Sequence, residues 1–300
     1  ERPEVVILWG NEPLKSNPDG FLGHWLIDLM KLGTKLIVID PSLTWLGAKA
    51  DVWLRIRPGT DGAMALAFQH VVIKEDLLDH DFIDNWTYGF ETLAERAAEW
   101  SPERVADICW VDAEDIWKAA RMYGNAHPAG VQWGLAIDQQ PDGIAAAQGI
   151  AALTAITGNL DVPGGNVIMR NGFNMSIHYS IGVEHIDPEV WKKRLGSDLS
   201  VLYQYGSVTA QEDSVLRAME MGEPYPIRML WFQSTNPIAN MAAEAPRVYQ
   251  AINNVPFIVV VDMFMTPTAA AFADLVLPCA MSCERNSIRV WWTPLRAISK

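Results

Sequence analysis

The sequence predicts an α/β fold made of two Rossmann-like, three-layer domains with mostly parallel sheets. A strand–loop–helix–strand order opens the chain and returns near residue 227, and the second strand of each unit ends on an aspartate, Asp40 or Asp262. Strands that alternate with helices favour parallel sheets covered by helices. A Pro-Gly-Gly turn at 161–165 divides the two units, so we expect domains at 1–165 and 166–300.

The first unit begins with an apolar strand at 5–9, followed by a loop of small and polar residues. Apolar spacing predicts a helix at 21–32 that ends at Gly33, and then a second strand at 35–39 that closes on Asp40 and Pro41. A short strand at 52–56 leads through Gly59 to a helix at 62–74. This order is typical of a βαβ unit.

The middle of the chain is rich in helices and tryptophans. Residues 129–133 read as a strand and 143–157 as an alanine-rich helix. Aromatic side chains mainly bury area, so we expect four tryptophans before that strand to anchor helix packing; they are Trp86, Trp100, Trp110 and Trp117.

The second unit repeats the first. A strand at 227–232 is followed by a loop, a helix at 242–252 and a strand at 257–261 that ends at Asp262. The segment 166–204 between the units lacks a clear period and is expected to be a long functional or domain-spanning stretch.

Composition excludes several classes of protein. The 300 residues carry a net charge of -13, so a basic footprint for nucleic acid is absent and an anionic membrane surface would repel the chain. No apolar run reaches the roughly 20 residues that a membrane span needs. The three cysteines, Cys109, Cys279 and Cys283, are too few for a typical zinc site, and Cys279 and Cys283 are interpreted as two small, half-buried thiols.

The ends of the strands carry groups suited to a nucleotide. Asp40 and Asp262 are placed to accept hydrogen bonds from ribose hydroxyls, and each preceding loop lies where a phosphate can approach the backbone. Asp61 can accept two hydrogen bonds from a guanine edge. In either unit taken alone, an ordinary strand-to-helix turn and a capping aspartate explain the same residues.

Read in order, these segments resemble the molybdopterin oxidoreductase family, the dimethyl sulfoxide reductase superfamily. The matching motifs are Gly10-Asn11-Glu12-Pro13, Ile39-Asp40-Pro41, Ala50-Asp51, Pro58-Gly59-Thr60-Asp61, Thr157-Gly158-Asn159, Gly164-Gly165, Asn236-Pro237, Val260-Val261-Asp262, Ala273-Asp274-Leu275-Val276-Leu277-Pro278 and Glu284-Arg285. The sequences at 138–140 and 157–165 are similar to those of anaerobic bacterial members, including acetylene hydratase-like and catechol dehydroxylase-like proteins.

The resemblance implies the central region of a molybdenum or tungsten enzyme that binds two molybdopterin guanine dinucleotides, one per unit. The implied cofactor contacts are Gly10, Asn11, Glu12, Asp40, Pro41, Gly59, Asp61, Thr235, Asn236, Pro237 and Asp262. It assigns no catalytic residue and no metal ligand to this chain. It places the metal ligand and a 4Fe-4S cluster in an N-terminal part outside the chain, and a C-terminal cap domain on its other side.

Further expectations follow from that placement. The 300 residues alone should be inactive, and an iron–sulfur electron-transfer subunit is a candidate partner of the intact enzyme. Such an enzyme would lie in the bacterial cytoplasm or, with a twin-arginine signal outside this chain, in the cell envelope. His178, Tyr179 and His185 could line a substrate funnel or be solvent-exposed loop residues.

Three residues depart from the family pattern. Glu12 replaces an asparagine, and its carboxylate would be repelled by a pyrophosphate, so it should point away or leave the contact to the backbone. Ser42 replaces an arginine, and Ser234 replaces a glycine. The first unit therefore keeps the pattern less well than the second.

Two other protein classes remain open. A cofactor-free structural subunit, like the large iron–sulfur subunit of respiratory complex I, has no need for Asp40, Asp61, Asn236 and Asp262. An ordinary dinucleotide-binding dehydrogenase would be expected to carry Gly-x-Gly-x-x-Gly after a strand, and neither unit does.

Overall fold

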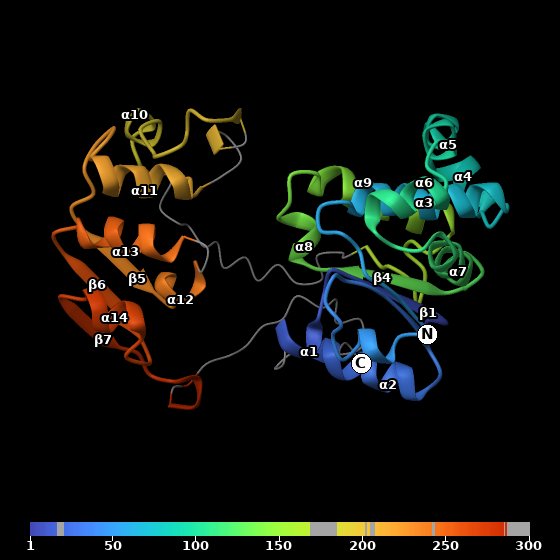
Figure 1. Ribbon diagram of the computed structural model, residues 1–300, viewed down its shortest axis with the longest axis horizontal. Helices are drawn as coiled ribbons and strands as arrows, with labels where there is room; N and C mark the ends of the chain where they lie inside the picture. Colours follow the sequence, from blue (N-terminus) through green and yellow to red (C-terminus); the bar gives the residue numbers. More distant parts are fainter. Residues whose placement is uncertain are drawn as a thin grey trace. The chain divides into compact units, whose positions relative to one another are not determined.

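The computed structural model describes residues 1–16, 21–168, 185–201, 203–204, 208–241, 244–284 and 286. The chain forms two compact units, residues 1–170 and 171–300, and each is described by itself (Figure 1). Both contain a parallel sheet with helices packed against it, which confirms the predicted α/β class.

The first unit is built on a four-stranded parallel sheet in the order β3-β2-β1-β4. Its strands are β1 (Val5–Trp9), β2 (Lys35–Ile39), β3 (Val52–Leu54) and β4 (Ala129–Trp133). Its helices are α1 (Pro13–Ser16), α2 (Phe21–Lys31), the 3₁₀ turn Gly47–Lys49, α3 (Asp61–Lys74), α4 (His80–Trp86), α5 (Phe90–Ala98), α6 (Pro102–Cys109), α7 (Ala113–Gly124), α8 (Leu135–Asp138) and α9 (Gly143–Ile156).

Helices cover both faces of this sheet, so β1 and β2 are buried along nearly their whole length. Alternate side chains such as Ile7 and Ile37 pack with α3, α7 and α9 in one core. Their neighbours Leu8 and Val38 face a second core with Leu26 of α2. Burial on both faces explains why these strands read as continuous apolar runs rather than alternating ones.

Side chains from outside the sheet complete its β4 edge. Asn166 accepts the Val131 N–H at 2.8 Å and donates to the Val131 carbonyl at 2.7 Å, as a neighbouring strand would. Asn159 accepts the Ala129 N–H at 2.8 Å. Asn166 therefore packs with the first unit, although we expected that domain to end at residue 165. The Thr-Gly-Asn and Gly-Gly turns carry the two asparagines to this edge.

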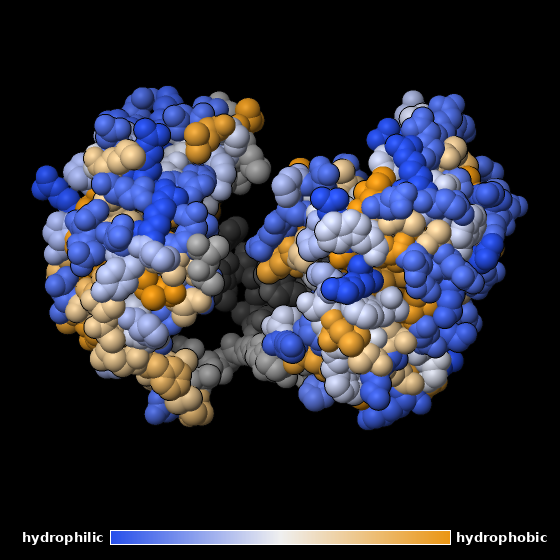
Figure 2. Space-filling model, viewed as in Figure 1, coloured by the Kyte–Doolittle hydropathy of each residue, from blue (hydrophilic) through white to orange (hydrophobic). Residues whose placement is uncertain are grey.

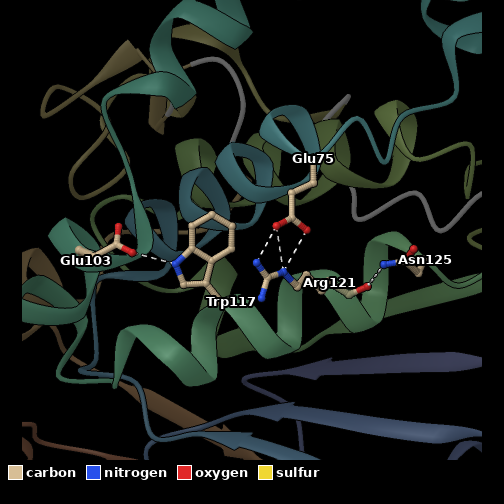
Figure 3. A network of polar contacts seen from close by, with 5 residues as sticks. All are labelled: Glu75, Glu103, Trp117, Arg121 and Asn125. Carbon is tan, nitrogen blue, oxygen red and sulfur yellow. Dashed lines mark hydrogen bonds and ion pairs between the residues drawn. The ribbon is translucent and has the colours of Figure 1, made fainter.

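A polar network joins three helices of the first unit (Figure 3). Arg121 of α7 donates to both carboxylate oxygens of Glu75, with contacts of 2.6–3.0 Å. Trp117 donates its indole N–H to Glu103 of α6 at 2.8 Å, and this bond holds the Glu103 pKa at about 2. The network ties α6 and α7 to the end of α3.

The expectation that four tryptophans anchor helix packing is confirmed for two of them. Trp100 and Trp117 pack against the main core as anchors. Trp86 and Trp110 are 79% and 69% exposed, so the prediction is wrong for them. The Arg57 guanidinium lies 4.8 Å from the Trp110 ring centroid, and this stacking takes the place of core packing.

The second unit is built on a three-stranded parallel sheet in the order β5-β6-β7. Its strands are β5 (Leu230–Gln233), β6 (Ile258–Asp262) and β7 (Leu275–Pro278). Its helices are α10 (Pro188–Trp191), α11 (Glu212–Met221), α12 (Pro237–Asn240), α13 (Ala245–Asn253), α14 (Pro267–Phe272) and the 3₁₀ turn Ser282–Glu284.

On the other face of this sheet, the two outer strands expose large apolar side chains. Phe232, Val260 and Val276 lie in one register row and pack with α11, α13 and α14. In the next row, Trp231 and Leu275 on the outer strands are 54% and 45% exposed, whereas Val259 between them is buried. Figure 2 shows hydrophobic residues at the surface around α14 and β7. Parallel sheets are normally buried on both faces, so these exposed side chains on the outer strands are unusual.

Candidate functional site

The two units share the geometry of the turn that follows their first strand. Gly10 has φ +56° and donates its N–H to the Ile39 carbonyl at 2.8 Å. Ser234 has φ +54° and donates its N–H to the Val261 carbonyl at 3.2 Å. In both cases the acceptor directly precedes the aspartate at the end of the second strand.

Replacing Ser234 with glycine is expected to raise the free energy of unfolding by about 0.5–1 kcal/mol, because a side chain at positive φ is strained. Urea unfolding measures the change. Ser234→Ala is the control, since alanine keeps the strain and should give no gain. A less stable glycine variant would show that the serine side chain compensates for the strain.

The aspartates Asp40 and Asp262 also make the same local hydrogen bond. Asp40 accepts the Ser42 N–H at 2.8 Å, and Asp262 accepts the Phe264 N–H at 3.1 Å. Burial raises the pKa of Asp40, the Ser42 N–H lowers it, and the charge of Glu12 raises it. Backbone thus fixes each carboxylate at the carboxyl edge of its sheet, where ligands bind in open α/β folds.

A second pair of aspartates has a structural role that the sequence interpretation treated only as a family motif. Asp51 accepts the Leu36 N–H at 2.9 Å, and Asp274 accepts the Ile258 N–H at 2.8 Å. Each one anchors the start of the strand that ends on Asp40 or Asp262. The equivalent positions in the two units show that the repeat is one of detailed geometry.

The first loop lies against the loop after β4. A Cβ atom added to Gly134 would lie 2.6 Å from the Gly10 carbonyl oxygen and 3.0 Å from the Asn11 Cβ. A Cβ added to Gly10 would lie 2.8 Å from the Ala136 Cβ. Only glycine at these positions lets the two chain segments approach so closely.

Asp61 is buried at the start of α3 and both of its oxygens accept hydrogen bonds. Trp9 donates to Oδ1 at 2.8 Å and Gln140 donates to Oδ2 at 2.9 Å. Gly59, two residues earlier, has φ +83° and lies in the same turn. A guanine edge that reached Asp61 would donate to the lone pair of Oδ1 that Trp9 leaves free. At Oδ2 it would either share the oxygen with Gln140 or replace the Gln140 hydrogen bond.

The loop Thr235-Asn236-Pro237 of the second unit leads into α12. Asn236 accepts the Thr268 hydroxyl at 2.7 Å, and the Thr268 side chain is fully buried. Thr235 is exposed and Pro237 begins the helix. The amide oxygen of Asn236 is therefore held by the protein.

Glu12 has a different environment in the first loop. Both carboxylate oxygens are buried and have no hydrogen-bond partner among the described residues. Its backbone carbonyl accepts the N–H groups of Lys15 and Ser16 at 3.0 Å. The carboxylate of Glu12 therefore does not point into solvent.

The structure places the predicted residues of the first unit on three neighbouring strand ends. Gly10, Asn11 and Glu12 follow β1; Asp40 and Pro41 follow β2; and Gly59 and Asp61 follow β3. In the second unit, Thr235, Asn236 and Pro237 follow β5, and Asp262 ends β6. Gln140 and Thr268 contact these residues from distant parts of the chain, which local sequence spacing does not reveal.

Other candidate residues lie elsewhere. His178 and Tyr179 fall outside the described residues, and His185 is exposed. Within the described ranges no group of three or more His, Cys, Asp or Glu side chains could hold a metal ion. A cavity of about 990 Å³ beside Val5 and Lys35 lies at the strand starts, opposite to the candidate site.

Cys279 and Cys283 are exposed, so the expectation of half-buried thiols is wrong for them. Cys109 is buried, and burial raises its pKa to about 11.

We expect iodoacetamide at pH 8 to modify Cys279 and Cys283 in the native protein and to spare Cys109, because the thiolate is the nucleophile. Peptide mass analysis reads out each site, with urea-unfolded protein as the control. Equal native modification of all three would contradict the burial.

Comparison with known proteins agrees with the fold and the motifs. The molybdopterin oxidoreductase family model matches residues 1–290. The chain belongs to the molybdopterin oxidoreductase family. It is 32% identical to acetylene hydratase of Syntrophotalea acetylenica over 286 residues, which cover 88% of this chain and 39% of that protein.

Two further comparisons give the same picture. The alpha subunit of F420-dependent formate dehydrogenase from Methanocaldococcus jannaschii is 32% identical, with 95% of this chain and 42% of that protein covered. The structure of acetylene hydratase from Pelobacter acetylenicus matches with a TM-score of 0.77 and 30% identity, over 97% of this chain and 43% of that one. The chain thus spans about two fifths of the length of these relatives.

Proposed function

We propose that this chain is the central cofactor-binding region of a molybdenum or tungsten oxidoreductase that holds two molybdopterin guanine dinucleotides. The observation that carries the proposal is the repeated strand-end geometry: each unit fixes an aspartate beside a small loop with the same turn. Two equivalent sites suit a cofactor bound in two copies.

The residues of the first unit fit a nucleotide. Asp40 and Glu12 supply acceptors for neutral donors, and Asp61 supplies a carboxylate at the next strand end. Gly10 packs tightly against Ala136, so the backbone of the first loop stays close to the carboxyl ends of the strands. When bound, such a cofactor supplies the metal and the redox chemistry, and this chain binds and orients its nucleotide ends.

In the second unit the fit rests on fewer groups. Asp262 would accept hydrogen bonds from ribose, and the backbone of Thr235 and Asn236 would lie beside phosphate. Ser234 keeps the left-handed turn of Gly10 without the glycine. The sequence pattern favoured the second unit, whereas the first unit carries more acceptor groups.

Parts of the intact protein outside this chain would complete the enzyme. The relatives are more than twice as long, and the exposed apolar side chains of Trp231 and Leu275 on the outer strands favour an apolar cover. We propose that domains of the same polypeptide cover these side chains, and that the metal ligand and a 4Fe-4S cluster lie in those domains. The subunit name of the formate dehydrogenase relatives makes an electron-transfer subunit a further candidate partner. No described helix combines the length and apolar character of a membrane span.

The exposed Trp231 and Leu275 predict a difference between the isolated chain and the intact protein. The 300-residue chain should bind the dye ANS strongly, because exposed apolar surface takes up the dye. The intact protein should bind it weakly, and Trp231→Ser with Leu275→Ser should reduce dye binding by the isolated chain. Equal, weak fluorescence from both proteins would show that these side chains need no cover.

Metal and nucleotide analysis separates the proposal from its alternatives. The intact protein should contain molybdenum or tungsten, should not bind NAD tightly, and should be redox-active only with its other domains. A metal-free protein that releases no guanine nucleotide would support a cofactor-free structural subunit. Tight NAD binding would support a dehydrogenase, and substrate reduction by the isolated 300 residues would contradict the predicted inactivity.

A further inference from the structure

The loops of the two units correspond residue by residue. Gly10 and Ser234 share the left-handed conformation, and three residues later Pro13 and Pro237 begin α1 and α12. Glu12 therefore occupies the position of Asn236, the last residue before each helix. The two side chains differ in what holds them.

The hydroxyl that holds Asn236 has no counterpart in the first unit. Thr44 and Thr266, each four residues after the strand-end aspartate, accept the N–H three residues further on, at 3.0 and 3.2 Å. Two residues after these threonines stand Leu46 and Thr268, both fully buried. Thr268 bonds to Asn236, whereas Leu46 offers no polar group to Glu12.

Among the described residues, the buried carboxylate of Glu12 has no hydrogen-bond partner. The Gly10 N–H bonds to the Ile39 carbonyl at 2.8 Å, so the loop that carries Glu12 begins beside Asp40. The charge of Glu12 accordingly contributes to the raised pKa of Asp40. Burying an unpartnered charge is unfavourable unless a ligand supplies donors. A pyrophosphate would increase the repulsion, whereas hydroxyl groups would relieve it.

We propose that Glu12 and Asp40 together accept hydrogen bonds from the two hydroxyls of a ribose diol, so that Glu12 is a ligand-contacting residue of the first unit. This inference rests on the proposed function, because it assigns a part of the nucleotide to that site. Two adjacent hydroxyls match two adjacent carboxylates, one donor for each acceptor. In the second unit Asn236 is tied to Thr268 and Asp262 binds the diol alone.

The test uses the intact protein prepared without cofactor, with GDP and 2′,3′-dideoxy-GDP as probes. Calorimetry should resolve two GDP sites in the wild type, and both should bind the dideoxy compound more weakly. In Glu12→Gln, one site should bind GDP about tenfold more weakly, since hydrogen bonds to charged groups contribute roughly 1.5–3 kcal/mol. That site should lose part of its preference for GDP over the dideoxy compound, because Asp40 still accepts one hydroxyl. The exposed Glu95 of α5 gives the matched control, Glu95→Gln, which should change nothing.

The thermal midpoint of the cofactor-free protein gives a second readout. Glu12→Gln should raise it, because the variant removes a buried, unpartnered charge. Tighter GDP binding by the variant would place Glu12 beside phosphate and overturn the inference. Unchanged binding, or an equal loss for both probes, would also overturn it. A wild type that binds no GDP contradicts the proposed function itself, and the inference with it.

Discussion

Asp61→Ala is expected to lower the free energy of unfolding by about 3 kcal/mol, because two buried donors lose their acceptor. The indole N–H of Trp9 is the more serious loss, since Trp9 is fully buried and has no access to water. Gln140 is partly exposed and can turn to solvent. The variant should also retain fewer guanine nucleotides in the intact protein.

A conservative variant separates the structural and ligand-binding roles of Asp61. Asp61→Asn keeps one oxygen for Trp9 and should recover most of the stability. It offers a single acceptor where a guanine edge needs two, so nucleotide retention should remain low. Urea unfolding followed by tryptophan fluorescence measures the stability, and nucleotide release on denaturation measures the retention.

The control for Asp61 is Asp28→Ala, which removes an exposed pair with Lys31. Such surface pairs contribute about 0–1 kcal/mol, so this variant should behave like the wild type. An Asp61→Ala protein with normal stability would contradict the buried hydrogen-bond pair. An Asp61→Asn protein with a full complement of nucleotide would remove Asp61 from the candidate site.

Gly134→Ala is expected to destabilise the first unit by about 2–4 kcal/mol, because the new methyl group meets backbone atoms that cannot move away independently. The φ of Gly134 is -117°, which suits any residue, so the effect comes from the contact alone. Relief would require the Gly10–Asn11 segment to move. Nucleotide binding by the first unit should therefore weaken together with stability.

Gly62→Ala is the matched control for this contact. A Cβ at Gly62 would meet its nearest atom at 3.9 Å, an ordinary distance, and alanine is favoured over glycine in a helix by about 1 kcal/mol. This variant should be as stable as the wild type or slightly more so. A Gly134→Ala protein that unfolds at the same urea concentration as the wild type would show that the two loops do not pack as described.

The parts of the fold that depend on local pattern could be predicted. Residues 129–133 form a strand with the expected bounds, and the helix expected at 143–157 ends one residue earlier, at Ile156. The strand expected at 52–56 ends at Leu54 because the chain turns there. The backbone N–H of Ile56 donates back to the Leu54 carbonyl, and the backbone N–H of Arg57 donates to the Cys109 carbonyl. In the second unit β5 begins at Leu230, three residues later than expected.

The interactions between distant residues could not be predicted. β7 is four residues long, and its pairing with β6 decides that it is a strand. Gln140 lies 79 residues from Asp61, and the Thr268 hydroxyl lies 32 residues from Asn236. The charge argument identified Glu12 as out of place beside phosphate, but only the packed structure shows that its carboxylate is buried and unpartnered.

The central claim is that each of the two units holds one guanine dinucleotide, and the nucleotide content of the intact protein tests it most directly. Denaturation of the wild type should release two guanine nucleotides for each molybdenum or tungsten atom. Asp40→Ala and Asp262→Ala, which change equivalent positions in the two units, should each reduce the number retained. Release of no guanine nucleotide, or of two from both variants, would contradict the claim.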